Sequence, residues 1–140
     1  MEKRIKIYID ENLPPQFAQA FNIIQSHLNN QESIPIDVLS IKEEFGKGAL
    51  DEDWIPVVGK QEGIVITQDL NIQHIRHQKE LYNKSNVGVI FLKSPNSGLT
   101  FWEMFKRLVR LWDEIKHTVR KHKPPFAFIQ RSKDKGLEQW

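Results

Sequence analysis

The stretch RIKIYIDENLPPQF, residues 4–17, describes a strand that ends in a charged turn. Apolar, β-branched residues alternate with polar ones over 4–9, which is typical of a β-strand. Two acids and an amide follow at once: Asp10, Glu11 and Asn12. The double proline after them fits the first turn of a helix, where a missing N–H is tolerated. Either these polar residues only manage the turn, or the strand delivers charge to a site.

Strand and helix patterns alternate along the rest of the chain. Short apolar runs predict further strands at 35–41, 63–67, 87–92 and 126–130. Helical spacing of apolar residues predicts helices at 13–28, 51–61, within the polar segment 68–82, and at 99–122. Thr100 and Glu103 predict a capping box on the last of these helices, and two glycines predict a loop over 43–50. The alternation is typical of a three-layer α/β/α fold with a mostly parallel five-stranded sheet.

The composition suits one soluble domain and excludes several kinds of chemistry. The chain has 140 residues, and no apolar run approaches the ~18 residues of a membrane span. The absence of cysteine excludes disulfides, thiolate metal sites and cysteine nucleophiles. Neither a Gly-rich phosphate loop nor a serine in a G-x-S-x-G turn is present. No signal peptide is evident, so a cytoplasmic protein without membrane contact is expected.

The charge is distributed unevenly along the chain. Residues 1–102 carry ten Lys and Arg against thirteen Asp and Glu, whereas residues 103–140 carry ten against five. A solvated basic helix face explains this excess of positive charge in the simplest way. Clustered Lys and Arg also attract phosphates at long range, so the C-terminal segment is a candidate surface for an anionic partner.

Acids from three separate segments fall at one edge of the predicted sheet. Asp10 follows the first strand, Asp69 follows the third, and Asp51 opens the helix that leads from the second strand. Because ligands of such sheets bind beyond the carboxyl ends of the strands, we expect the three carboxylates to converge there. Each acid also has a structural explanation, since Asp51 suits a helix N-cap, Asp10 or Asn12 could cap the first helix, and Asp69 could order a turn after the third strand.

Convergent carboxylates repel one another and need a counter-ion. At ~4 Å the repulsion between two of them is about 4 kcal/mol at an effective dielectric constant near 20. Oxygen-only ligands suit Mg²⁺ or Mn²⁺, and such a site can activate water and stabilise charge on a phosphate. His74 and His77 alone lack a third zinc ligand, but with Arg76 and Lys79 they form a basic turn that could hold a phosphate.

Three motifs together resemble a known family. IDENLP at 9–14, GALDEDW at 48–54 and GIVITQDLNI at 63–72 are similar to the PIN-like nucleases, in particular to the VapC-type toxin-like members that open with D-E-N-L-P. The resemblance covers residues 4 to about 93. It implies a PIN-like domain over residues 1–131 with strand order 3-2-1-4-5, followed by a loosely ordered tail at 132–140.

The resemblance also implies an activity and its residues. It implies cleavage of RNA with Mg²⁺ or Mn²⁺, often by the toxin half of a toxin–antitoxin pair. RNA and a cognate antitoxin protein are therefore the expected partners. Whether the chain forms a homodimer stays open. Matched motif by motif, Asp10, Asp51 and Asp69 are the catalytic and metal-binding acids. Weaker candidate ligands are Glu11, Asp53 and Asn71. The RNA-binding candidates are His74, Arg76, His77 and Lys79.

Two other function classes remain open at this stage. Many relatives carry a T-x-D-x-D pattern, and Asn71 stands where its second acid would be, which favours a catalytically inactive binding module. A phospho-receiver signalling domain also has acids after its first strand and an aspartate after its third. In that class a lysine follows the fifth strand, whereas Arg131 stands at that position here.

Overall fold

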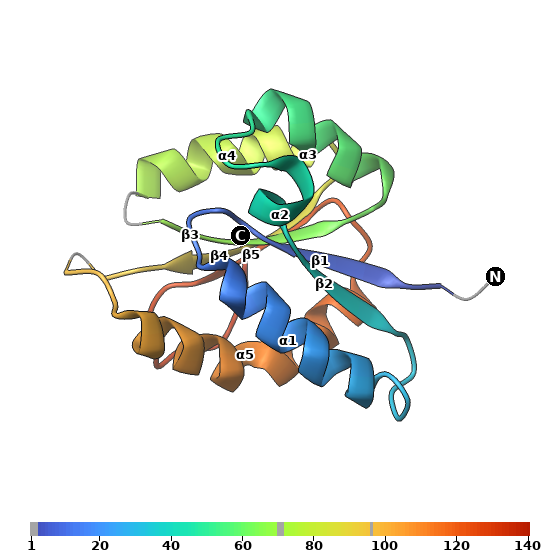
Figure 1. Ribbon diagram of the computed structural model, residues 1–140. Coiled ribbons are helices and arrows are strands. Elements are labelled where there is room, and N and C mark those ends of the chain that lie inside the picture. Colours follow the sequence, from blue (N-terminus) through green and yellow to red (C-terminus); the bar gives the residue numbers. More distant parts are fainter. Residues whose placement is uncertain (1–2, 70–71, 96) are drawn as a thin grey trace.

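A six-stranded sheet lies between two layers of helices in the computed structural model, which describes residues 3–69, 72–95 and 97–140, the side chains of residues 69 and 72 excepted (Figure 1). The strands are β1 (Ile5–Ile9), β2 (Ile36–Ser40), β3 (Ile64–Asp69), β4 (Gly88–Lys93), β5 (Phe126–Gln130) and β6 (Glu138–Gln139). The helices are α1 (Pro15–Leu28), α2 (Ile41–Phe45), α3 (Asp51–Lys60), α4 (Ile72–Lys84) and α5 (Phe101–Lys121). None of the described helices is both long and apolar enough to cross a membrane.

The predicted α/β/α architecture is confirmed, but the strand order differs from the expected 3-2-1-4-5. The observed order is β2-β1-β3-β4-β5-β6, with only β6 antiparallel, so β3 pairs with β1 rather than with β2. The chain crosses one face of the sheet through α1 and the opposite face through α3 (Figure 1). Because parallel crossovers are right-handed, crossovers on opposite faces move the chain in opposite directions. The second crossover therefore leads from β2 back past β1 and places β3 on the far side of β1.

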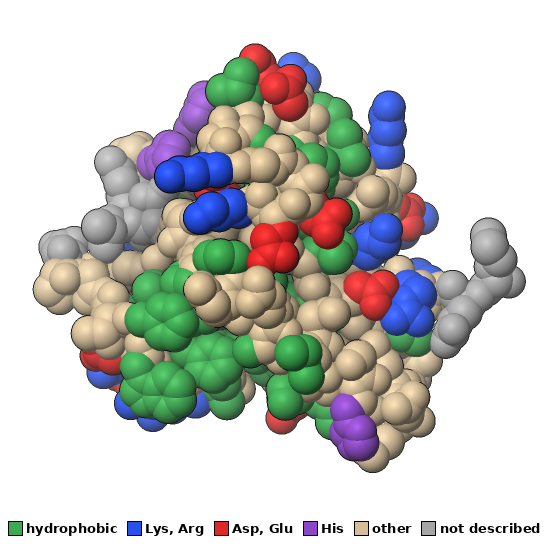
Figure 2. All heavy atoms as spheres, viewed as in Figure 1, with side chains coloured by type: hydrophobic (Ala, Val, Ile, Leu, Met, Phe, Trp, Pro, Cys, Tyr) green, Lys and Arg blue, Asp and Glu red, His purple; other side chains and the backbone are tan. Residues whose placement is uncertain are grey.

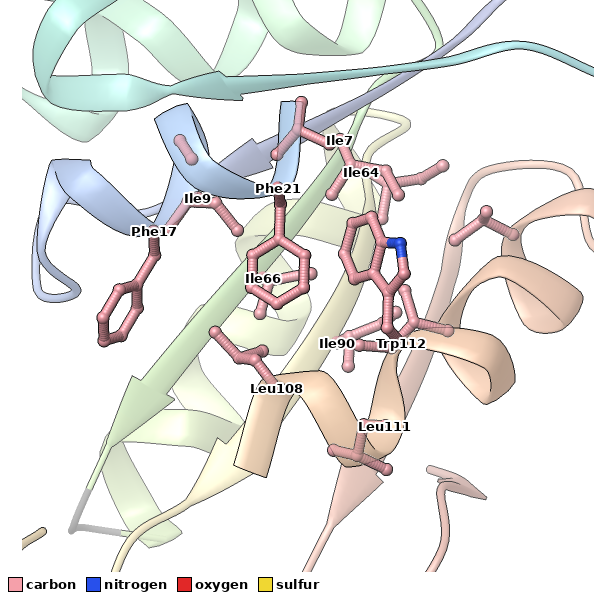
Figure 3. Close-up of a cluster of buried hydrophobic side chains, with 14 of the residues drawn as sticks. Ile7, Ile9, Phe17, Phe21, Ile64, Ile66, Ile90, Leu108, Leu111 and Trp112 are labelled. Carbon is pink, nitrogen blue, oxygen red and sulfur yellow. The ribbon is translucent and has the colours of Figure 1, made fainter. Parts of the chain in front are cut away.

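Each face of the sheet buries its own apolar core. Along β1 the side chains of Ile7 and Ile9 point to the face that α1 and α5 cover, and Tyr8 points to the face that α2, α3 and α4 cover. This alternation follows from the two-residue period of a strand. In the first core, Phe17 and Phe21 of α1 and the apolar stripe of α5 pack on the isoleucines of the sheet (Figure 3). The central strands are therefore buried on both faces and hold their ends rigidly.

Two segments are more ordered than the sequence indicates. The predicted loop over 43–50 begins inside α2, because the Ser40 hydroxyl accepts a hydrogen bond from the Glu43 N–H at 3.3 Å and caps a short helix. The tail at 132–140, which we expected to be loosely ordered, ends in β6. There the Trp140 N–H donates to the Ala127 carbonyl at 2.9 Å, and its side chain packs into the second core. The predicted capping box on α5 is confirmed.

A polar network joins α1 to α5 beside the first core. The Trp112 indole donates to the fully buried Gln25 side chain, whose amide donates to Glu32. Lys116 and Arg120 of α5 both pair with Glu32, at 2.6 and 2.7 Å. Burial raises the pKa of Glu32, but the hydrogen bonds from Lys116, Arg120 and Gln25 outweigh it and lower the pKa to about 2.

We expect Glu32→Gln to lower the free energy of unfolding by about 1–3 kcal/mol at pH 7, since it leaves the buried Lys116 ammonium without its carboxylate. Asp37→Asn, which breaks the more exposed pair with Arg4, should cost less than about 1 kcal/mol. Because folding lowers the pKa of Glu32, its contribution to the free energy of unfolding is fully present above about pH 4.5. This contribution is lost as the pH falls towards about 2. Urea unfolding at pH 7 and pH 3 measures both effects, and equal losses for the two variants at pH 7 would contradict this assignment.

Candidate active site

The carboxyl ends of β1 and β3 lie side by side at the point where the strand order reverses. The main-chain N–H of Asp10 donates to the carbonyl of Ile66 at 3.0 Å, which continues the β1–β3 ladder by one residue. In open α/β sheets the crevice outside such a reversal is where ligands bind. The observed strand order therefore brings the first and third strand ends closer together than the expected order would have done.

Asp10 is held in place by two hydrogen bonds to its carboxylate. The Thr67 hydroxyl donates to Oδ2 at 2.7 Å, and the Glu11 main-chain N–H donates to Oδ1 at 2.8 Å. Only 9% of Asp10 is exposed, and Thr67 is fully buried. Each carboxylate oxygen has two lone-pair positions, so each retains one for a further partner.

The electrostatic surroundings of Asp10 favour a cation. Burial raises the pKa of Asp10 above its usual value, and the negative charges of Asp51 and Glu11 raise it further. The hydrogen bonds from Thr67 and from the Glu11 N–H oppose this rise without cancelling it. A buried carboxylate that is disfavoured in its charged form gains stability from any positive charge placed beside it.

Asp51 faces the same region as Asp10. It is the first residue of α3, whereas Leu50 occupies the N-cap, so the prediction of Asp51 as an N-cap is wrong. Burial raises the pKa of the Tyr82 phenol, and the charges of Asp10 and Asp51 raise it further, so both carboxylates lie near Tyr82. Asp53 lies about 200° further round the α3 axis than Asp51. Of the two helix-start acids, Asp51 is the one whose charge raises the pKa of Asp10.

Glu11 and Asn12 fasten the turn after β1 to its neighbours. The Glu11 carboxylate accepts a hydrogen bond from the Gly48 N–H at 3.1 Å, in the loop that leads to α3. Gly48 has φ +76°, a conformation that glycine adopts without strain. The Asn12 amide donates to the Gln68 carbonyl at 2.5 Å and to the Thr67 hydroxyl at 3.2 Å. Asn12 therefore does order the turn, while Glu11 ties β1 to the segment that carries Asp51.

The third predicted acid lies at the end of β3. Asp69 is the last residue of that strand and is paired in register with Lys93 of β4, but its side chain is outside the described part of the structure. Asn71 also lies outside the described residues. Among the side chains that are described, no three His, Asp or Glu residues form a metal-binding group. The convergence of Asp69 with Asp10 and Asp51 stays a prediction.

A comparison with protein families identifies the fold family. The family model described as a PIN like domain matches residues 5–94, from the start of β1 to just after β4, and this range includes the predicted acids Asp10, Asp51 and Asp69. The chain belongs to the PIN-like domain family. No curated protein and no solved structure shows a significant match to it. The narrower VapC-type subgroup stays a proposal.

Membership in the PIN-like family points to a nuclease type of function, and PIN domains typically use divalent metals. The residues present fit such an ion. Asp10 is buried, fixed by two hydrogen bonds and still has free lone pairs, and Asp51 adds a second carboxylate nearby. Mg²⁺ and Mn²⁺ prefer oxygen ligands of this kind.

The predicted RNA-binding residues of this PIN-like domain differ in exposure: three are exposed, and Lys79 is half-buried. His74, Arg76 and His77 are exposed on the first half of α4. This helix follows β3 along the chain, and Figure 2 shows His, Lys and Arg side chains on that side of the molecule. Lys79 is half-buried, and its ammonium lies 4.8 Å from the centre of the Trp140 ring. A cation–π contact of this kind explains Lys79 as a packing residue.

Two residues of the site were not singled out from the sequence. Thr67 belongs to the T-x-D motif, but its hydrogen bond to Asp10 depends on the pairing of β1 with β3. Tyr82 has the helical spacing of an ordinary core residue of α4, and only its position near Asp10 and Asp51 distinguishes it. A signal for Thr67 was therefore present in the sequence, whereas none was present for Tyr82.

We expect Mn²⁺ to raise the melting temperature of the wild type by about 5–10 °C at a concentration 100-fold above its Kd, because the ion binds only the folded state. Asp10→Asn should remove most of this shift. Asp113→Asn, which changes a fully exposed acid on α5, is the matched control and should keep it. Differential scanning fluorimetry in EDTA and in Mn²⁺ makes the measurement, and an unchanged shift in Asp10→Asn would rule out Asp10 as a ligand.

Proposed function

We propose that this PIN-like domain is a metal-dependent endoribonuclease whose catalytic acids are Asp10, Asp51 and Asp69. The observation that carries the proposal is the buried Asp10 carboxylate, which is held by Thr67, lies near Asp51 and forms no ion pair with a described residue. A fold gains nothing in stability from such an arrangement unless a cation completes it. The family match supports a nuclease type of function in general, and its range of 5–94 covers these residues.

The proposed reaction is hydrolysis of a phosphodiester by in-line attack of water on phosphorus. A bound Mg²⁺ or Mn²⁺ supplies charge that activates water and stabilises the developing negative charge on the phosphate. Asp10 and Asp51 would hold that ion, with Asp69 as the third acid and Glu11 and Asn71 as further oxygen ligands. Thr67 and the Glu11 N–H fix the orientation of Asp10 before the substrate arrives, which lowers the cost of organising the site.

The exposed start of α4 supports RNA as the substrate. Arg76, with His74 and His77 when protonated, presents positive charge beyond the end of β3, where phosphates flanking the cleaved bond would lie. Lys79 is omitted from this surface because it packs against Trp140.

A toxin role in a toxin–antitoxin pair is a finer proposal, and it is supported by the D-E-N-L-P motif at Asp10–Pro14. It implies a partner protein that covers the acidic edge of the sheet, and a gene for that partner next to this one. Protection of a recombinant host by the neighbouring gene product would support this role.

A catalytically inactive PIN-like binding module is the second candidate. The observation in its favour is Asn71, which replaces an acid of the T-x-D-x-D pattern and lowers the negative charge of the site. Such a module would bind RNA without cleaving it, and it would bind a divalent ion weakly.

We expect wild-type protein to cleave a mixed pool of single-stranded RNA in 5 mM Mn²⁺, about 100-fold or more faster than Asp10→Asn, Asp51→Asn or Asp69→Asn. Asp113→Asn should retain full activity. Cleavage products resolved on a denaturing gel measure the rates. Equal cleavage by the wild type and all three site variants would indicate a contaminating nuclease. RNA binding without any cleavage would select the inactive module, and Asn71→Asp then tests whether the missing acid is the cause.

A further inference from the structure

A second feature of the carboxyl edge lies beyond β4 and β5. A pocket of about 460 Å³ opens between the loop that follows β4 and the segment that follows β5. Its charged and hydroxyl-bearing walls include Lys93, Ser94, Arg131 and Lys133. None of these residues belongs to the acidic site, and the function proposed above leaves the pocket unexplained.

The cations around this pocket are only partly neutralised. Arg131 pairs with Glu138 of β6, but among the described residues Lys93 and Lys133 form no ion pair. An adjoining cleft on α5, which shares Lys133, adds Lys106 and Arg110. Among the side chains that the structure describes, the acids lining the pocket are Glu103, which is already bonded to Thr100 in the capping box, and Asp134. The net charge of the combined surface is therefore positive.

Arg107 places a buried positive charge beneath the same surface. Only 4% of it is exposed, and it lines the adjoining cleft. Its guanidinium donates to the Gln130 side-chain oxygen at 2.5 Å and to the Gln130 carbonyl at 3.3 Å, both neutral groups. Burial lowers the pKa of Arg107 to about 10, so it remains charged at neutral pH. A buried cation without a carboxylate makes the cleft attractive to an anion.

Hydrogen bonds connect the pocket to the acidic site. The Ser94 hydroxyl donates to the Gln68 side chain at 3.0 Å, and the Gln68 carbonyl in turn accepts from Asn12, which is two residues from Asp10. Lys93 ends the strand next to β3, and β5 follows as the next strand. At about 4.8 Å between strands, Lys93 lies two strand spacings from β1, roughly 10 Å away along the edge. The charge of this edge thus changes from acidic at β1 to basic at β4 and β5.

Exposed aromatic rings adjoin the basic surface. Trp102 and Phe101, in the first turn of α5, are 61% and 50% exposed, and a hydrophobic patch is visible where α5 begins beside α1 (Figure 2). The Trp102 ring stacks on the Phe105 ring, and the ring centres are 5.7 Å apart. Lys106 follows Trp102 by four residues and so shares its side of the helix. An exposed aromatic ring beside a cation is an arrangement that binds single-stranded nucleic acid.

We propose that the pocket of Lys93, Ser94, Arg131 and Lys133 binds a phosphate of a single-stranded RNA whose cleaved bond lies at Asp10, and that Trp102 stacks on one of its bases. The choice of RNA rests on the proposed function. The subsite itself rests on the excess of positive charge among the described residues that line the pocket, on the buried Arg107 and on the exposed Trp102. A duplex fits less well, because its bases are already stacked and paired and do not offer a face to Trp102.

The test measures binding of a fluorescein-labelled single-stranded RNA of ten nucleotides in EDTA, which prevents cleavage, across a series of salt concentrations. In a plot of the logarithm of the association constant against the logarithm of the salt concentration, the wild type should have a negative slope. In Lys133→Ala and in Lys93→Ala this slope should be less steep by about 0.7, because each variant removes a contact between a lysine and a phosphate. Lys84→Ala, at the far end of α4, is the matched control and should leave the slope unchanged.

Trp102→Ala should weaken binding about 5- to 100-fold with an unchanged slope, because stacking releases no counter-ions. Ile23→Ala, another exposed apolar residue, is its control and should bind as the wild type does. Unchanged slopes in both lysine variants overturn the phosphate subsite. Duplex RNA that binds as tightly as single-stranded RNA overturns the choice of a single strand.

Cleavage in Mn²⁺ separates this inference from the proposed function. If the wild type binds RNA with a slope that depends on Lys133 but cleaves nothing, the subsite stands and the nuclease assignment fails. If the wild type cleaves RNA and the slopes of the lysine variants are unchanged, the nuclease assignment stands and the subsite is wrong.

Discussion

The hydrogen bond from Thr67 to Asp10 is the contact on which the site depends, and it exists only because β1 and β3 are neighbours. The two strands are adjacent because the crossovers before and after β2 run on opposite faces of the sheet. The strands are held in register by the isoleucines on one face and by Tyr8 and its neighbours on the other. A carboxylate can be kept buried there because the strands that present it cannot move apart without disrupting both cores.

Much of the fold was predictable because its signals are local. Alternating apolar residues identified β1, short apolar runs identified the other four parallel strands, and Thr100 with Glu103 identified the start of α5. The strand order was not predictable in the same way, because it depends on which face each crossover helix covers. The helix α2 was missed because Gly46 and Gly48 dominate that segment, whereas its cap, Ser40, lies at the end of a strand.

The candidate site also combines features that were predictable from the sequence with features that were not. Asp10 was identified because it follows a strand, and Asp51 because it begins a helix. Thr67 was already part of the quoted motif. The bond between Glu11 and Gly48, the position of Tyr82 and the packing of Lys79 on Trp140 depend on contacts between distant segments. Their residue types are too common in turns, cores and helix surfaces to predict such contacts. Sequence patterns thus located the charges, and tertiary packing decided which of them face one another.

The short strand β6 has a consequence for how the molecule behaves at high concentration. It covers the outer side of β5, a strand whose Ala127, Phe128 and Ile129 are buried, and Glu138 carries an ion pair to Arg131 across that edge. An apolar strand with an open row of N–H and C=O groups is a template for aggregation. Because β6 pairs with β5, this edge of the sheet ends in a strand of only two polar residues, and short polar edge strands disfavour edge-to-edge aggregation.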